Sequence, residues 1–427
     1  MATAGAAVGL GNIWKFPYIA GENGGGAFVL MYLFCIALFG IPIMIAEVML
    51  GKKARENPIN AMLKHSRTVD SGRFWSFIGV MGVAAGIMIL MYYSVVAGWA
   101  LEYVFQSATS AYIDKPTSEV ASVFGQLYEN KQQQLLWHSV FVGAAGIIVA
   151  AGVTRGIGVA VDILMPILFL LLLGLLYYAY QNGDFAAGLN FLFNPDFSKL
   201  SGKAMIVAMG HAFFTLSLGM GTVMVYGSYM PENASIAKSV LAVSFLDTFI
   251  ALVAGMTIFP IVFASGLTPG SGPGLLFETL PTAFSTMQHG AIVGTGFFVL
   301  VTIAALSSGI SLIEPGIAWL ERNGIKRVIA STTLVLVCWL GGIACIYSAE
   351  VFDSLDFLTS NIMLPLGGLA IAIFVGWKYG YTRTRKEMPN MNSILFNLLF
   401  IVLRFVAPIG VTIVFINGIV EFLERAP

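Results

Sequence analysis

Three acidic residues, Glu47, Asp247 and Glu314, stand inside long apolar stretches of the sequence. Asp247 lies near the middle of its stretch, without a basic residue nearby to neutralise it. If these stretches cross a membrane, a carboxylate there is costly to bury and indicates a functional site by default. The alternative for Asp247 is a protonated, hydrogen-bonded structural role. Glu47 and Glu314 are better interpreted as groups that brace helices or handle protons.

Catalysis is a poor interpretation of these residues. An intramembrane enzyme would need a nucleophile with a base, or paired carboxylates at a cleft. His211, Asp247 and the serines of the chain do not compose such a motif. The three cysteines, Cys35, Cys338 and Cys345, lie in apolar runs without metal-ligand spacing, which indicates packing residues.

The elements that must position these groups are membrane-spanning helices. Hydrophobic residues make up 58% of the 427 residues and charged residues only 10%, with zero formal net charge. This composition favours a lipid-bilayer protein and argues against a nucleic-acid partner. Apolar runs long enough to span a membrane occupy 26–51, 75–105, 136–152, 157–181, 203–229, 237–264, 290–320, 327–348, 357–377 and 393–422. With the interrupted apolar segment 1–20, the sequence predicts about 11 transmembrane helices and no strands.

Basic residues predict the orientation of these helices. They concentrate in the connections 52–73 and 378–386, which lie on the same side of the predicted membrane. By the positive-inside rule this side is cytoplasmic. We therefore expect a multi-pass protein of the plasma (inner) membrane with a cytoplasmic N-terminus and an external C-terminus. The external connections 106–135 and 265–289 are long enough to hold short helices that could act as lids.

Two segments, 5–12 and 213–221, place glycines and polar residues inside apolar runs. Glycine weakens a helix by about 1 kcal/mol relative to alanine. Non-helical backbone at membrane depth persists only where it is buried or lines a cavity. The two segments fall in the first and sixth elements, which is the spacing of an inverted five-helix repeat and indicates a transporter binding site. The alternative is that the glycines only permit close helix packing.

Four stretches of sequence resemble the neurotransmitter:sodium symporter family. They are GLGNIWKFPY at 9–18, ENGGGAF at 22–28, FFTLSLGMG at 213–221 and AALSS at 304–308. The resemblance covers essentially the whole chain and is closest to bacterial eleven-helix amino-acid transporters. It implies one transporter domain over 1–427 with a LeuT-like fold in which helices 1 and 6 are unwound. The repeats would be 1–181 and 203–377, followed by helix 11 at 393–422.

The resemblance implies Na⁺ as the coupling ion. The first sodium site would use Ala7, Asn12, Thr215 and Asp247, completed by the substrate carboxylate. The second would use Gly5, Val8, Ala304, Ser307 and Ser308. Many family members have asparagine at position 247 and need chloride, whereas aspartate supplies the negative charge from the protein. Chloride-dependent members have a serine where this chain has Ala251. We therefore expect that transport by this protein does not depend on chloride.

The resemblance also implies a pocket for a small amino acid. Its predicted residues are Ala7, Gly9, Leu10, Gly11, Ile89, Tyr93, Phe214, Thr215, Ser217, Met220, Ser308 and Leu312. Free N–H groups at the start of a half-helix suit the substrate carboxylate. Gly9 argues for an α-amino acid because monoamine carriers place an aspartate there. The apolar part of the pocket favours a substrate with a hydrophobic or aromatic side chain. An outer gate of Lys15 and Asp356 would close the pocket above the substrate.

Two features of the sequence leave other functions open. The family has a further half-helix before the first break, so the chain looks truncated, and a chain that truly starts at Met1 would be leaky, inactive or a sensor. A proton-coupled amino-acid carrier of the same fold is the nearest rival, and it would not need Asn12, Ser307 and Ser308 as sodium ligands. His211 stands where the family usually has glutamine. It could make the outer vestibule sensitive to pH, but we expect a neutral, hydrogen-bonded imidazole there.

Overall fold

The computed structural model describes residues 9–200, 202–270 and 272–425, which form helices and no strand. The α-helices are α2 (Phe16–Glu22), α3 (Gly26–Cys35), α4 (Ile41–Ala54), α5 (Pro58–Thr68), α6 (Ser76–Ala108), α7 (Thr117–Glu129), α8 (Lys131–Ala150), α9 (Val159–Asn182), α10 (Phe185–Phe193), α11 (Gly202–Thr215), α12 (Thr222–Tyr229), α13 (Ile236–Ala264), α14 (Leu280–Thr286), α15 (Gly290–Arg322), α16 (Arg327–Tyr347), α17 (Ala349–Phe357), α18 (Leu364–Ile373), α19 (Tyr381–Glu387), α20 (Ser393–Ile401) and α21 (Ala407–Arg425). Wider π-turns join several of them, namely η1 (Gly11–Lys15), η2 (Ile36–Gly40), η4 (Val153–Gly158), η6 (Leu275–Thr279), η7 (Leu358–Met363), η8 (Phe374–Tyr379) and η9 (Val402–Val406), and 3₁₀ turns are η3 (Arg73–Trp75) and η5 (Phe197–Lys199).

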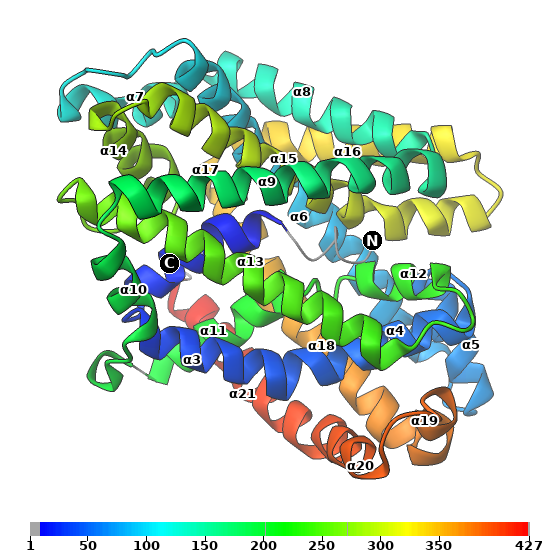
Figure 1. Ribbon diagram of the computed structural model, residues 1–427. Coiled ribbons are helices and arrows are strands. Elements are labelled where there is room, and N and C mark those ends of the chain that lie inside the picture. The colour runs from blue at the N-terminus through cyan, green and yellow to red at the C-terminus, as the bar shows by residue number, and fades with distance from the viewer. Residues whose placement is uncertain (1–8, 201, 271, 426–427) are drawn as a thin grey trace.

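Nine helices of the described residues are long and apolar enough to cross a membrane. Several run roughly parallel, as α8, α9 and α16 do in Figure 1. The all-helical membrane fold is therefore confirmed. The predicted span at 357–377 began too late, because the helix continues back to Ala349. Asp356, which directly precedes the predicted span, is paired with Lys15 in the structure.

The sixth apolar segment is broken as predicted. Helix α11 ends at Thr215 and α12 begins at Thr222, and the turn between them needs positive φ angles at Ser217 (56°), Gly219 (76°) and Gly221 (74°). Glycine adopts such angles without steric cost. Of the predicted break at 5–12 in the first segment, residues 5–8 lie outside the described residues, and the structure describes the chain from Gly9 onward.

Glu47 satisfies one of the backbone groups that the break exposes. The Gly219 N–H donates to Glu47 Oε1 at 2.6 Å, and the Glu47 side chain is fully buried on α4. A backbone N–H without a partner in such surroundings would be costly. The prediction that Glu47 braces helices agrees with this contact.

The two halves of the broken helix pack along one continuous helix, α3–η2–α4. Helix α11 lies against α3, and α12 lies against α4 (Figure 1). The second contact is very close: a Cβ on Gly51 would lie 1.9 Å from the backbone oxygen of Met224, and one on Gly227 would lie 2.6 Å from the oxygen of Val48. Small residues permit this close approach of two backbones within a membrane.

We expect Gly51→Ala to destabilise the protein by about 1–3 kcal/mol, because the added methyl group overlaps the α12 backbone and must push the helices apart. The measurement is the thermal unfolding midpoint of the detergent-purified protein. Gly174→Ala on α9 is the matched control, because nothing lies within 4 Å of its added Cβ. Equal midpoints for the two variants would contradict the close-packing argument.

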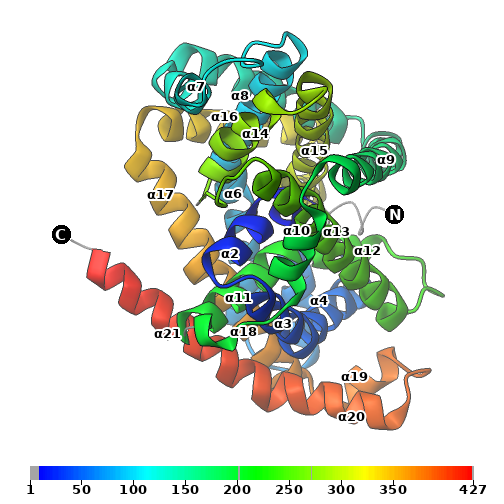
Figure 2. The same cartoon turned by 60° about the vertical axis from the view of Figure 1, so that its left-hand side comes forward.

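A second group of helices surrounds α6. This helix packs extensively against α15 and also contacts α8 and α16. The shorter helices α7 and α14 lie at one end of this group, α17 and α18 lie along another side, and α21 packs against α18 and α11, as the rotated view shows (Figure 2). The predicted connections 106–135 and 265–289 thus do contain short helices, α7 and α14. The break between α11 and α12 faces α6 and α15, which is where the polar residues gather.

Candidate functional site

A cavity lies between the broken helix, α6, α15 and the first described residues. It is lined by Gly9, Gly11, Asn12, Ile89, Tyr93, Phe214, Thr215, Ser217, Met220, Thr222, Ser308, Ser311 and Leu312. Every predicted substrate residue within the described part of the chain is in this set except Leu10, which is buried. Ala7 lies outside the described residues.

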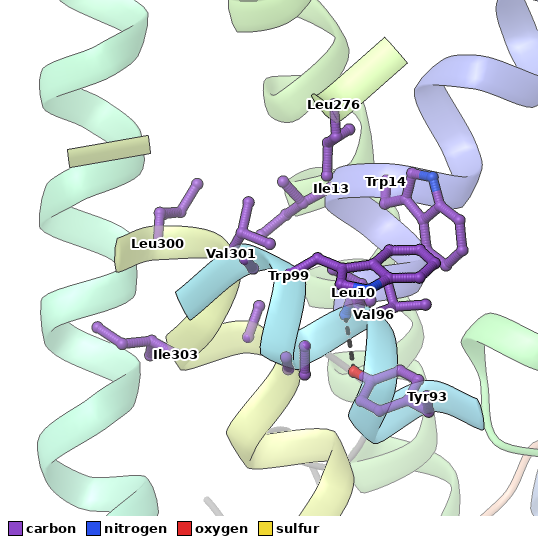
Figure 3. Close-up of a cluster of buried hydrophobic side chains, with 14 of the residues drawn as sticks. Leu10, Ile13, Trp14, Tyr93, Val96, Trp99, Leu276, Leu300, Val301 and Ile303 are labelled. Atoms are coloured by element: carbon purple, nitrogen blue, oxygen red, sulfur yellow. Dashed lines mark hydrogen bonds between the residues drawn. The ribbon is translucent and has the colours of Figure 1, made fainter. Parts of the chain in front are cut away.

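One end of the cavity is formed by the start of the first described helix. The Leu10 N–H donates to the Tyr93 hydroxyl at 3.4 Å, drawn as a dashed line in Figure 3. Ile13, Trp14, Val96 and other apolar side chains pack around this contact. The Leu10 N–H therefore points toward Tyr93 on α6, while the Gly9 N–H donates to the amide oxygen of Asn12.

Asp247 lies immediately behind the cavity, and its side chain is fully buried. Three groups donate hydrogen bonds to its carboxylate. They are the amide of Asn12 (2.7 Å), the hydroxyl of Thr215 (2.8 Å) and the hydroxyl of Tyr32 (3.3 Å). The described residues offer Asp247 no basic partner. Asn12, Thr215 and Asp247 thus meet from three elements, as the predicted first sodium site requires.

The amide of Asn12 decides what this group can bind. Its oxygen accepts the Gly9 N–H at 2.9 Å, and its nitrogen donates to Asp247. A cation between Asn12 and Asp247 needs the amide oxygen instead, and a half-turn of the amide group would supply it at the cost of the hydrogen bond from the Gly9 N–H. Oxygen-only ligands are what a hard cation prefers. The donor set is therefore suited to Na⁺ once the amide turns.

The α15 part of the predicted second sodium site lies next to the same segment. Ser307 donates to the Ala304 carbonyl at 2.9 Å, and a Cβ built on Gly9 would lie 1.9 Å from Ser308 Oγ. Two of the predicted oxygen ligands on α15, the Ser308 hydroxyl and the Ala304 carbonyl, therefore lie next to the chain at Gly9. Their predicted partners Gly5 and Val8 lie outside the described residues.

Three polar residues of this site were not predicted. Tyr32 donates to Asp247, while Thr222 and Ser311 line the cavity. Thr222 directly follows the broken turn, and Ser311 lies one helical turn after Ser307, so both positions could have been inferred from the neighbouring motifs. Tyr32 gives no such signal, because a tyrosine in an apolar helix usually indicates packing.

A second cavity lies beyond Phe214, and Phe214 lines both cavities. Lys15 and Asp356, the predicted gate, line the second cavity as well. Lys15 Nζ lies 3.1 Å from Asp356 Oδ1 and 4.0 Å from the centre of the Phe214 ring. Ser360 donates to the same carboxylate oxygen at 3.1 Å. The ion pair and the ring therefore separate the two cavities.

His211 lines the second cavity beside this gate. Its ring contacts Phe16 and Tyr32, with ring centres 6.1 and 5.2 Å away. Neither ring nitrogen has a hydrogen-bond partner within the described residues. The expected hydrogen bond of the imidazole is therefore not made with a described residue, and the ring packs against Phe16 and Tyr32 instead.

We expect Lys15→Met to speed release of bound substrate by roughly tenfold, because the variant loses both the ion pair and the cation–π contact that hold Phe214 over the cavity. Dissociation of a labelled amino acid from the purified protein measures this rate. Lys131→Met is the matched control: its Nζ lies 4.5 Å from the Tyr128 ring, far from the cavity on exposed α8. An unchanged release rate in Lys15→Met would show that the pair does not gate the cavity.

An interrupted helix beside a buried cavity, in a chain whose described residues include nine apolar spans, defines a membrane transporter with a central binding site. Comparison with known protein families identifies the family of transporters to which this chain belongs. A model of the sodium:neurotransmitter symporter family matches residues 1–115 and 130–426, and the chain belongs to this family. The unmatched residues 116–129 coincide with α7. The chain is thus a multi-pass membrane protein of a sodium-dependent symporter family, which is not an enzyme family.

Similar proteins support the assignment along the whole chain. A sodium-dependent transporter of Bacillus subtilis, YhdH, is 36% identical over 99% of this chain and 96% of its own length. A sodium-dependent transporter of Haemophilus influenzae is 32% identical over 98% of this chain and 96% of its own length. The crystal structure of MhsT in complex with L-phenylalanine is 42% identical, covers 98% of this chain and 97% of its own, and has a TM-score of 0.90.

Proposed function

We propose that this protein imports a hydrophobic or aromatic α-amino acid together with sodium, by alternating access around the cavity at the broken helix. The observation that carries the proposal is the buried Asp247 carboxylate, which meets Asn12 and Thr215 at the wall of the cavity. The bound L-phenylalanine of the similar protein MhsT supports an amino acid as the substrate. The apolar residues Ile89 and Leu312 favour a hydrophobic side chain.

Two sodium ions and no chloride complete the proposal. The first ion would lie at Asn12, Thr215 and Asp247, and the second at the α15 motif with Ser307 and Ser308. Asp247 supplies a fixed negative charge, and Ala251, one turn later, has no hydroxyl to offer an anion. Human GABA transporter 2, 25% identical over 92% of this chain, is described as sodium- and chloride-dependent, whereas YhdH is described as sodium-dependent.

The proposed orientation and repeats rest on the sequence. The basic connections 52–73 and 378–386 favour a cytoplasmic N-terminus and an external C-terminus. The two halves 1–181 and 203–377 would be the inverted repeats that rock about the cavity. The gate at Lys15 and Asp356 would then face outward.

The test is uptake of labelled phenylalanine and leucine into proteoliposomes that contain the purified protein. We expect uptake under an inward sodium gradient, with equal rates in sodium chloride and sodium gluconate. Uptake that follows a proton gradient in sodium-free buffer would favour the proton-coupled alternative. Rates that fall in gluconate would contradict chloride independence alone.

A further inference from the structure

Arg404 is the only charged residue of the membrane span Ser393–Asn417. Its guanidinium forms no ion pair or hydrogen bond with a described residue, and its Nε is buried without a partner. By contrast, Arg327 at the start of α16 is paired with Glu314. An unpaired charge in a span is costly and indicates a functional site by default.

Arg404 lies at the level where the neighbouring span ends. A Cβ on Gly376 would lie 2.8 Å from the Arg404 Cα, and Trp377 Nε1 donates to the Arg404 carbonyl at 2.9 Å. Trp377 lies near the end of the span Ala349–Tyr379, and the basic connection 378–386 begins directly after it. Tryptophan is enriched at the boundary between lipid and water. The guanidinium of Arg404 therefore lies near the headgroup level, on the side proposed to be cytoplasmic.

Two exposed aromatic side chains flank this guanidinium. Its Cζ lies 4.7 Å from the centre of the Trp377 ring and 5.4 Å from that of the Phe405 ring, and these side chains are 53% and 45% exposed. The rings attract the cation through their faces but replace none of its hydrogen-bond acceptors. Only Nε is enclosed, so the two terminal nitrogens can still donate to a ligand that comes from the lipid.

An apolar stripe continues from Arg404 into the membrane. Phe405, Ile409, Ile413 and Ile416 are all exposed, and their spacing of three or four residues places them along one face of the helix. In Figure 2 this helix, α21, lies along the edge of the molecule. A lipid whose headgroup lies at Arg404 can therefore place an acyl chain along the stripe.

The ligand must bring oxygen acceptors and a negative charge to Arg404. A phosphate diester supplies both, since a guanidinium donates two parallel hydrogen bonds to phosphate oxygens. Lys378 and Arg383 are exposed in the adjoining connection and would repel a headgroup that carries its own ammonium. We propose that Arg404 and Trp377 bind the phosphate of an anionic phospholipid such as phosphatidylglycerol. This site is separate from the central cavity and does not depend on the proposed function.

The test is binding of defined lipids to the detergent-purified full-length protein, measured by native mass spectrometry. Dioleoyl-phosphatidylglycerol is compared with dioleoyl-phosphatidylcholine, which has the same acyl chains and phosphate but adds a cation. We expect Arg404→Gln to bind phosphatidylglycerol roughly tenfold more weakly than the wild-type protein, because the charged donor is lost. Equal affinities of the two proteins for this lipid would overturn the inference.

Arg385→Gln is the matched control. The Arg385 Cζ lies 5.0 Å from the centre of the Phe396 ring, but its guanidinium already donates to the carbonyls of Met388 and Met391, at 3.2 and 2.8 Å. This variant removes the same charge without removing a free donor, so we expect a clearly smaller loss of affinity than in Arg404→Gln. Equal losses in the two variants would show that only the net charge of this region matters, and would contradict a site at Arg404.

Inorganic phosphate distinguishes a free anion from a headgroup. We expect phosphate to change the unfolding midpoints of the wild-type protein and Arg404→Gln equally, because it brings no acyl chain to the stripe. A stabilisation by phosphate that disappears in Arg404→Gln would assign the site to a free anion and contradict the lipid. Should Arg404→Gln fail to fold, the two lipids are compared on the wild-type protein alone, where equal binding of both overturns the inference.

Discussion

Replacement of Asp247 by asparagine is expected to weaken sodium binding by on the order of a hundredfold or more. Two unit charges about 4 Å apart attract by about 4 kcal/mol at an effective dielectric near 20, which sets an upper value near a thousandfold. Asparagine keeps the size and one carbonyl oxygen but removes the charge. Asp247 is fully buried, so solvent cannot replace the lost interaction.

The sodium dependence of thermal stability measures this loss without a substrate. Binding of an ion to the folded protein raises its unfolding midpoint with ion concentration, so midpoints are recorded over a series of sodium chloride concentrations at constant ionic strength with choline. Asp353→Asn, an exposed residue on α17, is the matched control. A wild-type sodium response in Asp247→Asn would exclude this carboxylate as an ion ligand.

The second large effect is expected at Arg327. Its guanidinium binds the buried carboxylate of Glu314 through two nitrogens, at 2.6 and 3.2 Å, and also contacts Glu321 at 2.8 Å. The Tyr229 hydroxyl donates to the same Glu314 carboxylate at 2.7 Å, so α12, α15 and α16 meet here. Arg327→Met would leave the Glu314 charge buried and unpaired. Losses of this kind cost about 3–5 kcal/mol.

A double variant separates the charge from the packing. We expect Arg327→Met to lower the unfolding midpoint by roughly 5 °C, and Arg327→Met combined with Glu314→Gln to recover most of this loss, because no unpaired charge remains. Arg322→Met is the control, since Arg322 makes an exposed ion pair with Glu56 at 2.7 Å and such pairs contribute less than about 1 kcal/mol. A double variant as unstable as the single one would show that shape, not charge, matters at this position.

The sequence predicted the fold well because its signals are local. Runs of apolar residues define the spans, and the glycines at 219 and 221 define the break between α11 and α12. The convergence of Asn12, Thr215 and Asp247 followed from the family resemblance, since no local pattern links residues that far apart. The structure brings them within hydrogen-bond distance.

What could not be predicted depends on contacts between distant segments. The bond from Gly219 to Glu47 and the bond from Tyr32 to Asp247 each join segments far apart in the chain. Nothing in either local sequence specifies the partner. The helix start at Ala349 was missed because the ion pair that makes Asp356 tolerable there comes from Lys15, on another helix.

The continuous helix from Gly26 to Ala54 supports both halves of the broken helix, α11 and α12. Its first half holds α11 and its second half holds α12, so the relative rotation of the two half-helices is set by the number of residues between these contacts. Each residue of a helix turns the chain by about 100° and advances it 1.5 Å. One residue added to or removed from the π-turn Ile36–Gly40 would therefore rotate one wall of the cavity against the other without altering any residue that lines it. The length of this helix is a determinant of the binding site in its own right.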